Sequence, residues 1–175
     1  MGTADAVTVA VEDERVDVVD RRSVHLRPRG GRAFPYHAAM DAPPDERDAI
    51  IAAGLEAAEL KATDAVAALG ADLEFEAIGV VISRGVRHIP LEKVLTSSRL
   101  FHMAEATVYQ QALRAAANNL GLPCTVVAFN DAENHDLWPV VSALGKALGP
   151  PWRKDQKFAA VAACLAAADL RHNRN

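Results

Sequence analysis

Two stretches near the start of the chain carry the alternation of apolar and polar residues that is typical of paired β-strands. The first, Val7–Val11, is rich in β-branched residues, and the acidic cluster Glu12–Glu14 follows it. In the second, residues 16–26, several valines alternate with charged neighbours. A period of two marks a half-buried strand, and Asp favours turns. The pattern therefore predicts a β-hairpin with one face in the core and the other in solvent.

Helical periodicity begins beyond this hairpin. Pro43-Pro44-Asp45-Glu46 is a helix start, because proline suits the first turn and acidic side chains face the positive end of the helix dipole. Apolar residues at helical spacing continue to Gly70, where we expect the helix to stop. Similar patterns predict a single helical turn over residues 90–95 and helices over residues 99–120, 135–148 and 154–170.

Apolar runs between these helices predict further strands. They cover Phe75–Ile82 and Pro123–Phe129, and an edge strand is expected near residues 33–36, inside a loop of residues 27–42. Strands that alternate with helices usually pair in parallel. Together with the hairpin they predict an α/β fold with a mixed sheet of about five strands. We expect a single domain over residues 1–175, with a frayed polar tail at 171–175.

Composition limits the classes of protein to which the chain can belong. Half of the residues are hydrophobic and 24% are charged, which is ordinary for a folded globular protein. The formal net charge of -4 argues against a dedicated, sequence-blind DNA-binding protein. Cys124 and Cys164 lie in apolar surroundings and lack metal-ligand spacing. We therefore expect both to be small core residues in a reducing compartment.

The sequence also disfavours membrane insertion, export and several enzyme classes. No apolar run approaches the roughly 18 residues that cross a bilayer, and the N-terminus lacks the basic and apolar segments of a signal peptide. We expect a cytoplasmic protein without membrane contact. No phosphate-binding loop, dinucleotide fingerprint or Gly-x-Ser-x-Gly elbow is present, which argues against NAD-dependent enzymes and serine hydrolases.

Two patches of sequence resemble a known family. Ala106–Leu113, followed by Gly121-Leu122-Pro123, resembles the segment after the central strand in the RuvC-type branch of the ribonuclease H-like superfamily, which includes Holliday-junction resolvases. Trp152–Lys157 is similar to the place where that family sets a late catalytic carboxylate. The order of predicted elements is similar as well. The resemblance implies a ribonuclease H-like mixed sheet flanked by helices.

The resemblance also implies a metal-dependent nuclease acting on nucleic acid. Such enzymes hold two Mg²⁺ or Mn²⁺ ions about 4 Å apart, and these hard cations need carboxylate oxygens from several elements. Carried onto this chain, the catalytic residues are Glu12, Glu105 and Asp155, and Asp13 is a further metal ligand. A structural interpretation stays open beside this one. Glu12 and Asp13 can form the polar corner of the hairpin, and Asp155 can face the dipole of the last helix.

Basic residues offer contacts for the phosphates of a nucleic acid. Arg84 and Arg87 follow the strand predicted to end at Ile82. Open α/β sheets bind ligands at the carboxyl ends of their strands, so an anionic ligand is expected there. The loop that holds Arg27, Arg29 and Arg32 provides a second set of cations. A solvated loop is the structural alternative in both places.

Two histidines complete the predicted substrate-binding set. His37 lies in a loop beside aromatic residues, an arrangement that suits stacking on a base. His102 and Glu105 are three residues apart, so they share a face of the helix predicted over residues 99–120. A third hypothesis takes these same three residues as a small-molecule or transition-metal site, because imidazole titrates near neutral pH.

The chain departs from the family where an acidic ligand is expected, and this keeps a second function open. The family has an acidic residue at the end of its central strand, whereas this chain has Ile82-Ser83-Arg84. The alternative is a catalytically inactive member of the same fold that acts as an interaction or assembly module. Alanine-rich helices pack closely, so the helix over residues 155–170 makes a homodimer plausible.

Overall fold

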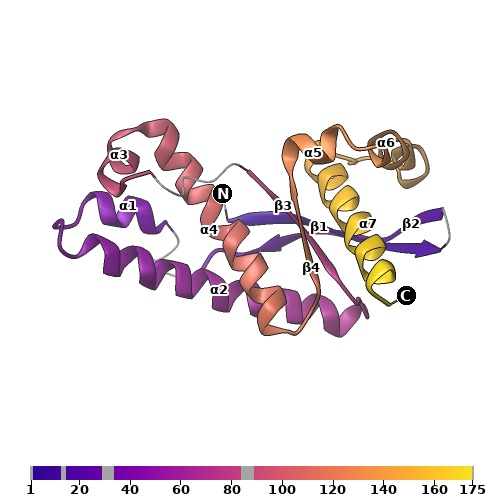
Figure 1. Ribbon diagram of the computed structural model, residues 1–175, viewed down its shortest axis with the longest axis horizontal. Helices are drawn as coiled ribbons and strands as arrows, with labels where there is room; N and C mark the ends of the chain where they lie inside the picture. The colour runs from indigo at the N-terminus through magenta and orange to yellow at the C-terminus, as the bar shows by residue number, and fades with distance from the viewer. Residues whose placement is uncertain (1, 13–14, 29–33, 84–88, 175) are drawn as a thin grey trace.

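The computed structural model describes residues 2–12, 15–28, 34–83 and 89–174, and it has a mixed α/β fold that is mainly helical (Figure 1). Its elements are, in chain order, β1 Thr3–Glu12, β2 Arg15–His25, α1 Pro35–Met40, α2 Arg47–Asp72, β3 Ile78–Ile82, α3 Leu91–Thr96, α4 Ser98–Asn119, β4 Cys124–Ala128, α5 Phe129–Glu133, α6 Leu137–Leu148 and α7 Lys154–Arg174. Helices α1 to α4 extend toward one end of the molecule, and α5 to α7 gather near the other (Figure 1).

Strands β1 and β2 form the antiparallel hairpin that the alternating pattern predicts. The register runs from Thr3 opposite His25 to Glu12 opposite Arg15, with an irregularity between Thr8 and Val9. The pairing begins earlier than the β-branched run, so the hairpin is longer than predicted.

Strands β3 and β4 pair in parallel, as the order of strand, helix and strand predicts. Their register joins Ile78 to Cys124 and Ile82 to Ala128. At Gly79, in β3, a Cβ atom would overlap the backbone carbonyl of Ala162 in α7. The absence of a side chain there lets the backbone of α7 approach the strand closely.

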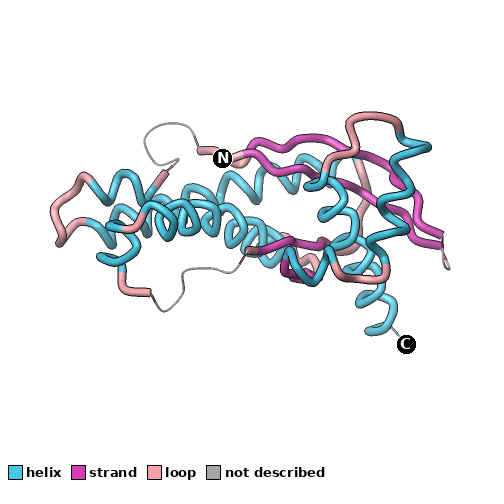
Figure 2. The backbone as a smooth tube through the Cα atoms, turned by 90° about the horizontal axis from the view of Figure 1, so that it is seen from above, coloured by secondary structure: helices cyan, strands magenta, loops and turns pink. Residues whose placement is uncertain are grey.

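The strands do not form the single mixed sheet that was predicted. Among the described residues, β1–β2 and β3–β4 are separate two-stranded sheets. Figure 2 shows the two pairs apart from one another. Helix α7 packs against both pairs through contacts with β1 and β3. An apolar pattern identifies a strand but does not determine which edges pair.

The predicted edge strand near residues 33–36 is also wrong where the structure describes it. Pro35 and Tyr36 lie instead in the first turn of α1. Proline is favoured there because its missing N–H would have no partner inside the helix in any case. The last helix likewise differs from the prediction, since α7 continues past Leu170 to Arg174.

Helices cover the strands from two opposite faces. Ala4 of β1 and Ile78 of β3 pack against the apolar cluster formed largely by α2 and α4. Val7 of β1 and Val81 of β3 pack against the cluster formed largely by α5, α6 and α7. Neighbouring strand residues point to opposite faces. The even-numbered Ala4 and Ile78 therefore pack against the first cluster, and the odd-numbered Val7 and Val81 against the second. β1 and β3 therefore contact helices on both of their faces.

Candidate functional site

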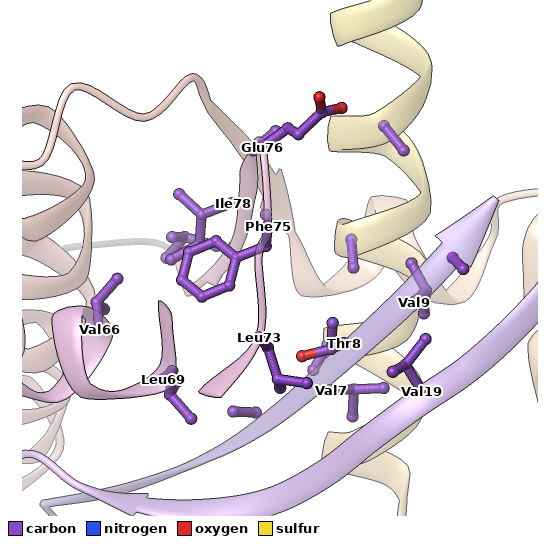
Figure 3. A pocket seen from close by; sticks show the side chains of 18 of the residues that line it. Val7, Thr8, Val9, Val19, Val66, Leu69, Leu73, Phe75, Glu76 and Ile78 are labelled. Carbon is purple, nitrogen blue, oxygen red and sulfur yellow. The ribbon is translucent and has the colours of Figure 1, made fainter. Parts of the chain in front are cut away.

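A cavity of about 760 Å³ lies between the hairpin and the parallel strand pair (Figure 3). It contacts every residue of Ala4–Val11 in β1 and every residue of Asp72–Val80, which leads into β3. Successive residues of a strand point to opposite faces. Contact with the unbroken run Ala4–Val11 therefore places the cavity beside the edge of β1 rather than over one face. Of β3, only Ile78–Val80 border it, since residues 73–77 precede that strand. We call it the strand-edge cavity.

The edges of β1 and β3 that border this cavity have no second strand partner within the described part of the chain. β1 is hydrogen-bonded to β2 along one edge, and β3 to β4 along one edge. The remaining edge of a strand presents a row of backbone N–H and C=O groups. The row of β1 borders the cavity over Ala4–Val11, and that of β3 borders it over Ile78–Val80 only.

The other walls of the strand-edge cavity are apolar. Helix α2 contributes Val66 and Leu69, which lie beside Phe75 in Figure 3. Helix α7 contributes a row of alanines spaced four residues apart, Ala159, Ala163 and Ala167. Residues at this spacing share one face of a helix, and their small side chains leave space between α7 and the strand edges.

Charged residues line the cavity where α7 ends. Arg171 and Arg174 are on this helix, and Glu74 and Glu76 precede β3. Arg174 pairs with Glu76 at 3.1 Å, and both side chains are more than half exposed. Exposed ion pairs contribute about 0–1 kcal/mol. This end of the cavity can therefore open at small cost.

A second polar site lies between α1 and α4, around the carboxyl group of Glu105. The Glu105 side chain is fully buried, and its Oε1 accepts a hydrogen bond from the backbone N–H of His37 at 3.0 Å. Nδ1 of His37 lies 3.2 Å from the same oxygen, and the His37 side chain is half exposed. Oε2 of Glu105 has no hydrogen-bond partner among the described residues. One oxygen thus holds α1 on α4, and the other is buried without a partner.

Aromatic side chains surround this carboxyl group. The ring of Phe101 packs edge-on against His37, with centroids 4.2 Å apart. Burial raises the pKa of Tyr36 and of Tyr109, and the charge of Glu105 raises both further. The two phenols therefore stay protonated at neutral pH. The site combines a buried carboxylate, an imidazole and two phenols.

The structure does not bring the three predicted catalytic carboxylates together. Gly2, just before β1, lies beside Tyr109, one turn of α4 from Glu105. The length of β1, roughly 30 Å at the usual rise per residue, then separates this end from Glu12 at the hairpin corner. Asp155 is exposed in the first turn of α7. Within the described ranges, no three His, Cys, Asp or Glu side chains gather in a way that could hold a metal ion.

The other predicted site residues fall into three groups: a pair that meets, a residue that lies apart from that pair, and residues outside the described ranges. His37 and Glu105 do meet, although 68 positions separate them in the chain. His102 is exposed and is not among the hydrogen-bond partners of that pair. Arg84, Arg87 and Asp13 lie outside the residues that the structure describes.

Cys164 is buried in the core, whereas Cys124 is only partly buried, and neither thiol has a lowered pKa. Burial raises the pKa of the Cys164 thiol to about 11 and also raises that of Cys124. The thiolate is the reactive form of cysteine, and burial disfavours it at both positions. The candidate chemistry of the chain therefore lies elsewhere.

Sequence reasoning missed the strand-edge cavity. One local signal was present in the sequence, the alanine row Ala159, Ala163 and Ala167 on one helix face. Such a row marks a face that another element approaches closely. It does not show whether that approach leaves a space, because the position of β1 against β3 is set by long-range packing.

Comparisons with known proteins give no relative of this chain. No family model, no curated protein and no solved structure matches it. Among the helices that the structure describes, none has the length and apolar character to cross a membrane.

Proposed function

We propose that this chain is a ribonuclease H-like protein that acts as an interaction module, with the strand-edge cavity as its binding site. The order of elements supports the fold, since an antiparallel hairpin is followed by parallel strands that alternate with helices. The cavity supports the function. Its volume lies in the range of ligand sites, roughly 300–1,000 Å³, and its walls are mainly apolar.

The placement of the carboxylates favours this function over a nuclease. Two-metal catalysis needs acidic ligands around cations about 4 Å apart. Glu12 and Glu105 lie toward opposite ends of β1, and Glu105 directs one oxygen to His37 instead. The nuclease remains a prediction from the sequence resemblance.

A metal titration tests the nuclease prediction directly. We expect Mn²⁺ to leave the melting temperature of the wild type and of Asp155→Asn unchanged, because no shared carboxylate site would bind it more tightly in the folded state. Differential scanning fluorimetry, with and without Mn²⁺, measures the melting temperature of both proteins. If Mn²⁺ stabilises the wild type and Asp155→Asn loses this effect, a carboxylate metal site exists and the interaction module is the weaker hypothesis.

A fluorescent apolar dye tests the cavity as a binding site. We expect 8-anilinonaphthalene-1-sulfonate to bind the folded wild type, and Ala167→Phe to weaken its affinity by roughly fivefold, or about 1 kcal/mol, because the new ring fills part of the cavity. Fluorescence titration gives both dissociation constants.

The neighbouring residue provides a matched control. Ala168 is exposed on α7 and does not line the cavity, so Ala168→Phe should bind the dye like the wild type. Equal dye binding by all three proteins would mean that the dye binds elsewhere, and the cavity would lose its support as a site.

A further inference from the structure

We infer that the ligand of the strand-edge cavity is an extended segment of a partner polypeptide, which enters between β1 and β3 as an additional strand. This inference rests on the proposed function and identifies the chemistry of the partner. Its basis is the combination of the unpartnered edge of β1, walls that are mainly apolar, and a cavity that follows β1 over Ala4–Val11 and reaches the first residues of β3, Ile78–Val80.

The chemistry of the two edges identifies the ligand as a polypeptide. Each edge presents backbone N–H and C=O groups in alternation, and leaving such groups unpaired in an apolar cavity is costly. A strand carries the same alternation along both of its edges at the same spacing. It can therefore pair with β1 on one side and with β3 on the other. An acyl chain or another hydrocarbon ligand would leave both rows unpaired.

The two walls define the side chains of this segment. Val66 and Leu69 of α2 lie on one side of the cavity and helix α7 on the other (Figure 3). The alanines of α7 line the cavity on that second side. A strand that is covered on both faces is apolar at nearly every position, rather than at alternate positions. The small alanines leave more room on the α7 side, so we expect the bulkier residues of the segment to point there.

The direction and length of the segment follow from the strands that flank it. β1 runs away from the N-terminus, whereas β3 runs back toward that end of the molecule (Figure 1). An inserted strand is thus parallel to one neighbour and antiparallel to the other. The cavity follows Ala4–Val11 of β1 and reaches Val80 of β3, which suits a strand of ordinary length, about six residues.

Three synthetic peptides test this inference on the full chain. The first has six consecutive β-branched residues between lysine pairs that keep it soluble, and it carries a fluorophore. The second alternates threonine or lysine with the apolar residues. The third is the first with N-methyl groups at alternate positions, which removes the N–H donors of one edge. Fluorescence anisotropy gives each dissociation constant.

We expect the all-apolar peptide to bind, and the alternating and N-methylated peptides to bind at least roughly tenfold more weakly. Ala167→Phe should weaken the binding of the all-apolar peptide, whereas Ala168→Phe should leave its dissociation constant unchanged. Hydrogen exchange on the wild type provides a measurement that needs no variant. Binding of the all-apolar peptide should slow amide exchange in residues 4–11 and 77–80 specifically.

Each other outcome points to a different conclusion. If the dye binds in the cavity but the peptides do not, or if the N-methylated peptide binds equally well, strand addition is overturned while the interaction module stands. Oleate that displaces the dye without slowing exchange in either strand would identify an acyl ligand instead. If neither dye, oleate nor peptide binds, the proposed function itself fails.

Discussion

Replacing Gly79 with alanine is expected to lower the free energy of unfolding by about 3 kcal/mol. A Cβ atom at this position would overlap the carbonyl carbon and oxygen of Ala162 and lie 2.8 Å from the backbone nitrogen of Ala163. These atoms belong to the backbone of α7, so no side chain can rotate to make room. The helix would have to move away from β3 as a unit.

Chemical denaturation of wild type and Gly79→Ala measures this effect, and the chain contains a suitable control. Gly70 lies in α2, where an added Cβ atom would meet the ring of Phe75 at an ordinary distance of 3.5 Å. Alanine is the better helix former by about 1 kcal/mol, so Gly70→Ala should be neutral or stabilising. A wild-type unfolding curve for Gly79→Ala would show that α7 does not pack on β3 as described.

Replacing Glu105 with alanine should destabilise the protein by about 2–4 kcal/mol, the next largest effect. The change removes the acceptor for the backbone N–H of His37, and an unsatisfied buried donor costs about 1–3 kcal/mol. It also leaves a void at a fully buried position, which adds to the loss. The attachment of α1 to α4 should weaken most. Hydrogen exchange in residues 35–40 would detect that local effect beside the global unfolding curve.

Glu105→Gln separates the loss of the hydrogen-bond acceptor from the loss of the carboxylate charge, and a variant at another glutamate serves as a control. Glu105→Gln keeps an oxygen that can accept the His37 N–H, so we expect it to stay within about 1 kcal/mol of the wild type. Glu92 pairs with Arg47 at the surface, and Glu92→Ala should cost about 0–1 kcal/mol. A Glu105→Ala protein as stable as Glu92→Ala would rule out a structural role for the buried carboxyl group.

Helix positions were predictable because their signals are local. The four-residue start at Pro43 comes just before α2, which spans Arg47–Asp72 and continues two residues past the stop predicted at Gly70. α4 was expected over residues 99–120 and covers Ser98–Asn119. Periodic apolar residues within a single segment are sufficient to predict such a helix. The short helix α1 was missed, since six residues contain too little periodicity to outweigh a loop composition.

The candidate sites were less predictable because their residues come together through tertiary packing. Glu105 was selected for its carboxylate chemistry, and His37 for its position in an aromatic loop. Neither choice indicated that the backbone N–H of one would donate to the side chain of the other. Glu12 was grouped with Glu105 by analogy, whereas β1 holds them toward its opposite ends. Spacing along a sequence says little about distance between elements that pack through a core.

The sequence alone determined the approximate positions of the four long helices, that the first two strands form a hairpin, and that the next two pair in parallel. Each of these depends on residue spacing or on connections between neighbouring elements. The tertiary structure decided that β1 and β3, which both pack against α7, do not pair with one another. Pairing between distant strand edges depends on how all the helices pack at once. For that reason the strand-edge cavity became visible only in the folded chain.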